Sequence, residues 1–389
     1  MANISVKYVS QKVNKVRWQP GDLQGLHPSN VFVTGSWDND ENQICLWHLP
    51  KSKEKGKHGI NSDRSSSFAN GDLDLDEMDK EPQLVCQETH KGDVTDLKFV
   101  NSETLLASSS AGTVQAYKLM HGAQKLHSIQ QWQDLHRVQT RSSPCTCMAV
   151  SGTDIATAGE DGRLNVLRLD HKHPIRTIDE ADSSTINALT YLKSHQVISV
   201  NSTGQMKIWD LRQPGSQPTR VFLLTGEKTA LHCIDRHSTQ AHLVAAGSQD
   251  SVLNFWDLRQ EKFPVTLFDG HKGPIWEVKF HPTYSDHLFT CSEDGSVFHW
   301  NGSGSPLVSQ LATGTGDSIY PSLGLGGLPS KPSVSSPTTS PWLNNDQVDI
   351  SHVLPSNIMP VNSIDVEGDK LVCGTDGEAV FVVNGLGLR

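Results

Sequence analysis

A repeated β-hairpin pattern most constrains what this chain of 389 residues can fold into. Each copy pairs two short apolar strands across a tight turn, as in TAGEDGRLNVL at 157–167 and TCSEDGSVFHW at 290–300. Successive turns lie 42 to 50 residues apart from Gly112 to Gly295, and 82 residues then separate Gly295 from Gly377. Glycine suits such turns because a positive φ costs it little. A period of this length is typical of one small sheet repeated around a ring.

Flanking strands complete each repeat. An alternating apolar run precedes each of seven hairpins, and another follows six of them, so the seventh unit lacks a fourth strand. The segment ISVKYVS at 4–10 has the composition of a strand, and we expect it to complete the C-terminal unit so that no sheet edge stays open. The sequence therefore predicts an all-β chain that forms a single seven-bladed β-propeller over 1–389, closed by its N-terminal strand.

Two segments interrupt the β pattern. Residues 51–82 in blade 1 are strongly charged, and residues 303–346 in blade 6 are rich in Ser, Gly and Pro. Neither composition supports a core, so we expect two flexible insertions on the same rim of the disc. Three Ser-Pro pairs in the second insertion are candidate phosphorylation sites: Ser305, Ser336 and Ser340.

Composition excludes several classes of function. The net charge of −10, without a basic face, argues against direct nucleic-acid binding, and no apolar stretch is long enough for membrane insertion. The seven cysteines show no CxxC pair, which favours buried thiols over a metal site. No phosphate-binding glycine motif occurs. We therefore expect no cofactor, no metal, no small-molecule substrate and no enzymatic activity.

The hairpins that end in Trp209-Asp210 and Trp256-Asp257 resemble those of the WD-repeat β-propellers. That resemblance implies a hydrogen-bonded structural tetrad in the sixth repeat, formed by His271, Ser292, Asp294 and Trp300. It implies a partial tetrad in the repeat before, formed by Ser248, Asp250 and Trp256. Because buried polar groups need partners, we interpret the Ser, Asp and His of TCSEDGSVFHW as structural and not catalytic.

A closer resemblance rests on TGSWDNDENQICLW at 34–47, on ADSST within 159–192, and on LVCGTDGEA at 371–379. These segments are similar to a small WD-repeat nucleoporin family of about forty-three kilodaltons. The family resemblance implies a scaffold subunit of the Y-shaped subcomplex of the nuclear pore, docked on an α-helical solenoid subunit of its short arm. It also implies roles in nucleocytoplasmic transport, mRNA export and pore assembly, and at mitotic kinetochores in chromosome segregation. The implied location is the nuclear envelope.

Two alternatives remain at this stage. An enzyme on a propeller scaffold would need a convergent polar cluster along the central channel, whereas we interpret the inner strands as mainly apolar, with isolated charges. A WD-repeat adaptor, such as a ubiquitin-ligase receptor or a histone-binding propeller, fits the same repeats; an acidic rim pocket would favour the latter, whereas the one acidic tract here lies within 51–82. Trp37 and Trp342 are candidate interface residues, since interfaces favour tryptophan. The alternatives are that Trp37 packs between blades and that Trp342 docks its insertion back onto the disc. Trp276, on an innermost strand, is predicted to pack between blades. We expect the partner to meet the rim opposite the insertions, because mobile loops would need ordering on burial.

Overall fold

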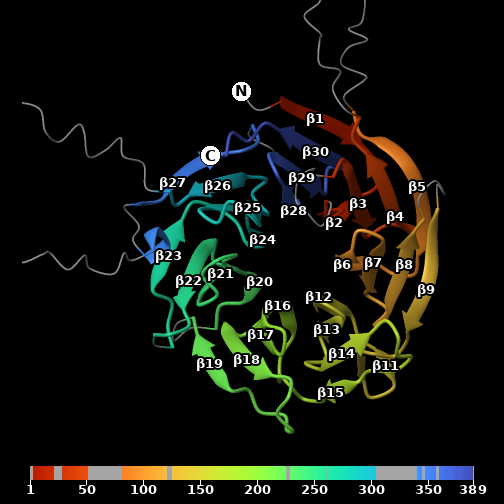
Figure 1. The fold of residues 1–389 in the computed structure, drawn as a ribbon, viewed down its shortest axis with the longest axis vertical. Coiled ribbons are helices and arrows are strands. Elements are labelled where there is room, and N and C mark those ends of the chain that lie inside the picture. The colour runs from red at the N-terminus through yellow and green to blue at the C-terminus, as the bar shows by residue number, and fades with distance from the viewer. Residues whose placement is uncertain are drawn as a thin grey trace, which may run out of the picture.

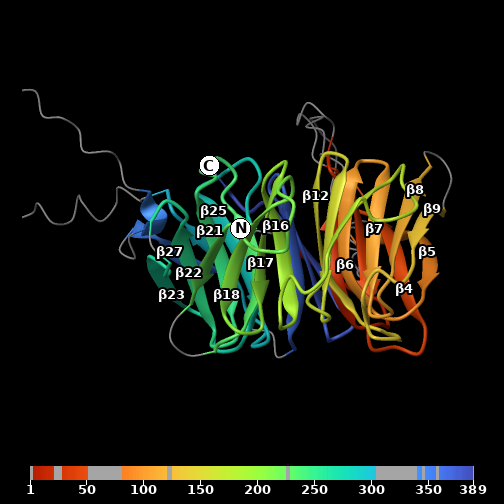
Figure 2. The same cartoon turned by 90° about the horizontal axis from the view of Figure 1, so that it is seen from below.

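Seven four-stranded antiparallel sheets surround a central channel in the computed structural model, as Figure 1 shows along the axis and Figure 2 shows from the edge. The structure describes residues 3–21, 29–50, 81–120, 125–224, 228–260, 262–303, 340–343, 347–355 and 359–388. Over these ranges it contains β-strands and one 3-10 turn, with no α-helix. The predicted seven-bladed β-propeller is confirmed.

Each blade runs from an inner strand at the channel to an outer strand at the circumference. Blade 1 consists of β2 (Val13–Trp18), β3 (Val31–Ser36), β4 (Asn42–His48) and β5 (Gln83–His90). Blade 2 consists of β6 (Val94–Asn101), β7 (Thr104–Ser109), β8 (Val114–Leu119) and β9 (Leu126–Trp132). Blade 3 consists of β12 (Cys145–Ser151), β13 (Asp154–Gly159), β14 (Leu164–Arg168) and β15 (Arg176–Ile178). A small hairpin, β10 (Arg137–Val138) with β11 (Arg141–Ser142), lies between blades 2 and 3.

The second half of the chain repeats this order. Blade 4 consists of β16 (Ile186–Lys193), β17 (Gln196–Asn201), β18 (Gln205–Asp210) and β19 (Arg220–Leu223). Blade 5 consists of β20 (Leu231–Arg236), β21 (Leu243–Ser248), β22 (Val252–Asp257) and β23 (Thr266–Asp269). Blade 6 consists of β24 (Ile275–Phe280), β25 (His287–Ser292), β26 (Val297–Asn301) and β27 (Asp349–His352), with the 3-10 turn η1 (Pro341–Leu343) between its last two strands.

Blade 7 joins the two ends of the chain. Its three inner strands are C-terminal: β28 (Val361–Glu367), β29 (Lys370–Thr375) and β30 (Ala379–Asn384). The outer strand is β1 (Asn3–Tyr8), which pairs antiparallel with β30 from Asn3 opposite Asn384 to Tyr8 opposite Ala379. Closure by the N-terminal strand is therefore confirmed, and this noncovalent pairing is called the closure below.

The antiparallel order gives the disc two distinct faces. We call the upper face the one that carries the turns between second and third strands and the connections between blades. The lower face carries the links between third and fourth strands, into which 51–80 and 304–339 insert. Both predicted insertions therefore start from the same face, although most of their residues lie outside the described part of the chain.

The upper turns have the backbone conformation expected of tight hairpins. Gly162 and Gly295 have φ values of 68° and 81°, in the left-handed region where a side chain is strained. In blade 5 the same place is taken by Ser251, with φ of 72°. In blade 7 the left-handed residue is Glu378 and not the neighbouring Gly377. The left-handed position of the turn is thus the same in these blades, but the residue that occupies it differs, and in blade 7 the glycine lies one residue before it.

Seven apolar clusters stabilise the ring, one at each interface between neighbouring blades. The cluster between blades 5 and 6 also contains Trp342 of η1, whose ring stacks on Phe255 at 5.2 Å between centroids and meets Phe280 edge-on. Trp342 is fully buried. Of the two roles expected of Trp342, docking on the disc is therefore confirmed and that of an interface residue is wrong, because its indole completes the core between two blades. The final part of the predicted insertion 303–346 is packed on the disc.

Candidate functional site at the central channel

The inner strands of all seven blades share one irregularity. Each has a β-bulge after its first residue, for example between Val13 and Lys15 in β2 and between Ile275 and Glu277 in β24. A bulge leaves one residue out of the ladder and re-aims its side chain. The residues left out form a ring at the upper end of the channel: Asn14, Thr95, Thr146, Asn187, His232, Trp276 and Asn362.

Five of these side chains link each blade to the next. Asn14 donates from Nδ2 to the carbonyl of Val94 at 2.6 Å, and Asn187 donates to the carbonyl of Leu231 at 2.8 Å. The same link runs from Thr95, Thr146 and Asn362 to the first residue of the following inner strand. In blades 5 and 6 the bulge residues are His232 and Trp276, whose rings lie 4.7 Å apart between centroids. At this point the bulge side chains form an aromatic pair instead of the link, and Sγ of the next residue, Cys233, donates to the carbonyl of Ile275 at 3.4 Å.

The channel opens on the upper face into a hollow of about 560 Å³, which we call the mouth. Four carboxylates from separate turns line it, together with one ammonium group, that of Lys15: Asp93, Glu160, Glu293 and Asp376. Among the described residues none of the four forms an ion pair. Acidic side chains are thus concentrated at a second place besides the tract within 51–82. The turns bring a second acidic group together, which sequence reasoning missed because its members are far apart along the chain.

Trp37 and Trp276 both line the mouth. Trp37 is half-buried, and its Nε1 donates to Oδ1 of Asp376 at 3.1 Å, so a contact between blades 1 and 7 fixes the ring. Lys12 lies over its face at 5.8 Å from the centroid. Trp276 is half-buried too and packs against the apolar cluster between blades 6 and 7, as expected of an interblade residue. It also presents part of its ring to the mouth, which the packing interpretation alone did not anticipate.

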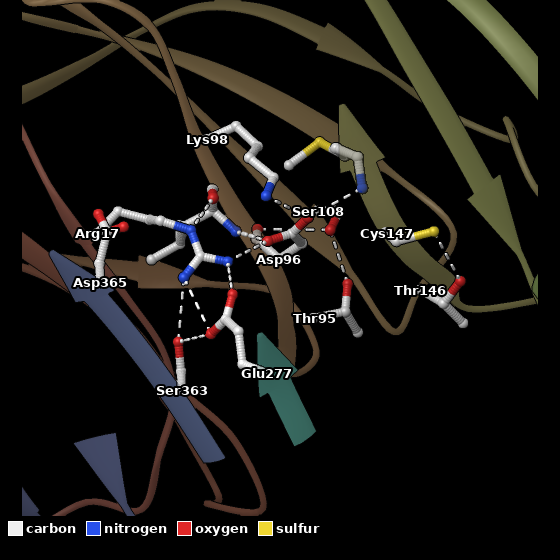
Figure 3. Close-up of polar contacts among 12 residues, drawn as sticks. Arg17, Thr95, Asp96, Lys98, Ser108, Thr146, Cys147, Glu277, Ser363 and Asp365 are labelled. Carbon is white, nitrogen blue, oxygen red and sulfur yellow. Dashed lines mark hydrogen bonds and ion pairs between the residues drawn. The ribbon is translucent and has the colours of Figure 1, made fainter. Parts of the chain in front are cut away.

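Below the mouth, a buried ionic network crosses the channel (Figure 3). Arg17 of β2 donates from Nη2 to Oε1 of Glu277 on β24 at 2.6 Å and to Oδ1 of Asp96 on β6 at 3.2 Å. Ser363 of β28 accepts from Nη1 of Arg17 at 3.1 Å and donates to Glu277 at 2.6 Å. Arg17 is 4% exposed and Glu277 is 6% exposed. The network therefore ties blades 1, 2, 6 and 7 together out of contact with bulk water.

Burial and charge act in opposite directions in this network. Burial raises the pKa of Glu277, but the positive charges of Arg17, Lys15 and Lys279 outweigh it and hold that pKa well below its usual range. Burial also lowers the pKa of Arg17, and Glu277 and Asp96 reverse this, so the guanidinium stays protonated. The sequence interpretation of the inner strands as mainly apolar, with isolated charges, is wrong here. A signal was present, because Lys15, Arg17 and Asp96 occupy the alternate inner-strand positions that face the channel.

The predicted tetrad of blade 6 forms with one change of residue. Thr290, and not Ser292, accepts from Nε1 of Trp300 at 2.8 Å and meets Nε2 of His271 at 2.6 Å. Asp294 is linked through Ser296, whose hydroxyl donates to it at 2.5 Å. Ser292 instead donates to the carbonyl of Gly273 at 2.9 Å. The strand register explains the change, since Trp300 pairs with Leu288 and its indole reaches the residue two positions further on.

The same rule explains blade 5. Ser248 donates to Asp250 as predicted, but Nε1 of Trp256 has no partner among the described residues. Trp256 pairs with Val244, and two positions further on lies Ala246, which has no hydroxyl. The predicted partial tetrad of Ser248, Asp250 and Trp256 therefore does not form one network. Ser248 bonds to Asp250, and Trp256 is linked to neither.

Blade 3 holds a network that the sequence did not indicate. His136 bonds through Nδ1 to Asp161 at 3.0 Å and through Nε2 to Thr157 at 3.1 Å. The tryptophan of the WD pattern is replaced by Leu167, which pairs with Ile155 two residues before Thr157. His136 and Thr157 are fully buried, so this His, Asp and hydroxyl series is inaccessible to a substrate.

The remaining candidates are placed as follows. Ser305 and Ser336 lie outside the described residues, and the hydroxyl of Ser340 is buried beside η1. Burial raises the pKa of all seven cysteine thiols: Cys45, Cys86, Cys145, Cys147, Cys233, Cys291 and Cys373. No group of three or more metal-ligating side chains occurs within the described ranges. None of the helical structure described there is long and apolar enough to cross a membrane.

Comparison with known proteins agrees with this architecture. The family model described as "WD domain, G-beta repeat" matches residues 81–118, 217–257 and 262–301. The chain is 42% identical to Nucleoporin Nup43 of Mus musculus over 99% of its own length and 100% of that protein. The same values hold for Nucleoporin Nup43 of Homo sapiens. The chain belongs to the Nup43 family. A Dictyostelium discoideum protein, nuclear pore complex protein nup43, is 25% identical over 60% of this chain and 51% of its own.

The Nup43 relatives match over the whole propeller, including the blades in which the WD pattern is incomplete. The comparison identifies a nucleoporin propeller without assigning a role to the mouth or to the Arg17 network.

Proposed function

We propose that this chain is a structural subunit of the nuclear pore complex scaffold, a protein-interaction platform that supports nucleocytoplasmic transport, mRNA export and pore assembly. The observation that carries the proposal is the identity of 42% to two Nup43 nucleoporins over essentially the whole of each chain. Similarity confined to single WD repeats would suit any propeller, whereas similarity over every blade favours the same surfaces and the same assembly.

A non-catalytic role agrees with the chemistry of the described residues. The two His, Asp and hydroxyl series, around His136 and His271, each hold a buried threonine and hydrogen-bond to it. A nucleophile needs access to substrate, and these hydroxyls serve to satisfy histidine and tryptophan nitrogens. Incubation with common hydrolase substrates should give no turnover above that of buffer.

For the partner, the proposal is an α-helical solenoid subunit of the short arm of the Y-shaped subcomplex, docked on the upper face. The upper face carries Trp37, Trp276 and the exposed β10–β11 hairpin, whereas 51–80 and 304–339 start from the lower face. We extend the proposal to the nuclear envelope in interphase and to kinetochores in mitosis, following the family resemblance.

The test is affinity purification of the tagged full-length chain from nuclear-envelope extract, followed by mass spectrometry. We expect scaffold nucleoporins, with a helical solenoid subunit as the most abundant partner. Deleting 51–80 and 304–339, while keeping the buried Trp342, should leave this set of partners unchanged. Recovery of ubiquitin-ligase subunits or histones in place of nucleoporins would instead support the WD-repeat adaptor, the second candidate function.

A further inference from the structure

The mouth combines three properties that favour one kind of ligand. Its charge is negative, because four carboxylates from blades 2, 3, 6 and 7 outnumber the ammonium group of Lys15, which lines the mouth, and that of Lys12, which lies over Trp37. Glu160 and Glu293 are exposed at the tips of their turns and form no hydrogen bond through their carboxylates among the described residues. A concave surface with unpaired charges of one sign raises the local concentration of ligands of the opposite sign.

The second property is an aromatic wall. Trp276 and His232 lie in contact where these aromatic bulge residues replace the ones that link the other blades, and Glu293 follows the adjoining strand of blade 6. Burial lowers the pKa of His232, more than Gln249 and Glu293 raise it, so the imidazole stays neutral near pH 7 and does not repel a cation. Trp37 already has the ammonium group of Lys12 over its face. Indole faces attract cations by their quadrupole.

The third property is size. A hollow of about 560 Å³ is within the range of pockets that enclose a small ligand, and it is too small to admit a folded element. One long side chain, with the extended backbone on either side of it, fills such a volume.

We propose that the mouth binds an arginine side chain presented by an extended segment of a partner protein, with the guanidinium between the aromatic wall and the carboxylates of the turns. Arginine suits this site better than lysine, because a planar guanidinium stacks on indole while its five N–H groups reach carboxylates in several directions. The inference goes beyond the pore assignment, since it concerns the isolated propeller and does not depend on which assembly contains it.

The test uses the full-length chain labelled with 5-fluorotryptophan, with the fluorine resonances of Trp37 and Trp276 assigned by substituting each with Phe. The probe is a blocked pentapeptide with a central arginine between glycine and serine residues. The same peptide with lysine or with neutral citrulline serves for comparison. We expect both resonances to shift saturably with the arginine peptide, and the citrulline peptide to bind about tenfold more weakly because it lacks the charge.

A matched pair of variants separates the mouth from overall charge. Glu160→Gln combined with Glu293→Gln should weaken the arginine peptide about tenfold without changing the melting temperature. Asp286→Asn combined with Asp349→Asn removes the same charge from exposed positions just before β25 and at the start of β27 in blade 6, and should leave binding unchanged. Equal binding of arginine and citrulline, equal loss in both double variants, or no saturable shift overturns the proposal. Shifts that depend on protein concentration without peptide would mean that a second copy fills the mouth, which overturns it too.

Discussion

The two sides of the central channel differ in how the blades are held together. On the side of the closure, blades 6, 7, 1 and 2 meet through the Arg17 network, with Glu277 and Asp96 as buried counter-charges. On the opposite side, blades 3 and 4 present small or neutral groups such as Cys147, Ala149 and Ala188. A hollow of about 470 Å³ opens there toward the lower face. The ionic network is therefore concentrated where the ring has no covalent continuity.

This difference indicates that side-chain contacts stabilise the ring where the backbone does not connect neighbouring blades. Blades 3 and 4 are joined by continuous backbone, so the chain still links them when the contacts between them loosen. Blades 7 and 1 have no such continuity across the closure, where the hydrogen bonds between β1 and β30 and the apolar cluster that contains Val13 and Val382 hold the ring together. Arg17 adds a contact between the inner strands, which line the channel, whereas β1 and β30 pair on the outer side of blade 7. Polar links from Asn362 to Val13 and from Trp37 to Asp376 reinforce the same interface.

The largest expected effect comes from removing the centre of this network. Arg17→Met leaves Glu277 and Asp96 buried without their cation, and such a loss costs about 3–5 kcal/mol in the free energy of unfolding. Urea denaturation monitored by tryptophan fluorescence measures it. A cost below about 1 kcal/mol would show that the network contributes little to closure and would remove the contrast between the two sides.

The pH dependence of the same network gives the second test. The pKa of Glu277 is lowered in the folded state from its usual 4.5, so its contribution is present above that value and is lost as the pH falls through the folded pKa. Glu277→Gln should therefore be less stable than the unmodified chain at pH 7, and the difference should shrink progressively as the pH falls below the unfolded value of 4.5 toward the folded pKa. Urea midpoints measured for both proteins between neutral and strongly acidic pH check this. A difference that is constant over the whole range would contradict it.

Breaking a network within one blade should cost less stability than breaking the Arg17 network, which joins four blades. Asp294→Ala removes an acceptor for the backbone N–H of Lys272 and for the hydroxyl of Ser296, and we expect a cost of about 1–3 kcal/mol. The matched control is Asp250→Ala in blade 5, where Trp256 is not linked, and it should cost less. Thermal melts of the two variants provide the measurement, and equal shifts would mean that the link to the tryptophan adds nothing.

The smallest effect is expected on the side of the channel without ion pairs. Thr190→Val changes a half-buried channel residue of blade 4, and it should alter the free energy of unfolding by less than about 0.5 kcal/mol. Urea denaturation under the conditions used for Arg17→Met allows direct comparison. A cost approaching that of Arg17→Met would show that both sides of the channel contribute alike.

The sequence was sufficient for the parts of the fold that repeat. The spacing of the hairpins predicted the blades, and the surplus N-terminal strand predicted the closure, because both follow from local alternation. The tetrad was misplaced by two residues, since Ser292 and Thr290 face the same side of β25 and only the pairing of Trp300 with Leu288 selects between them. Arg17 and Glu277 are 260 residues apart, and their contact depends on the complete ring.

Trp342 shows the same limit from the other direction. It follows a Ser-rich segment with no periodic pattern, so nothing local distinguishes a core residue from an exposed one. Its burial depends on a space between Phe255 of blade 5 and Phe280 of blade 6, which exists only after both blades have formed. The mouth was missed for a related reason, since its four carboxylates come from turns of different blades.

The pairing of β1 with β30 also has a consequence for biosynthesis. The ribosome makes Asn3–Tyr8 long before the strand that receives it, Ala379–Asn384. During translation the nascent polypeptide is an open arc with an unpaired edge at either end, and such edges are prone to mispairing. A premature stop before Ala379 would leave β1 permanently without its neighbour, so such a product should be sent to quality control.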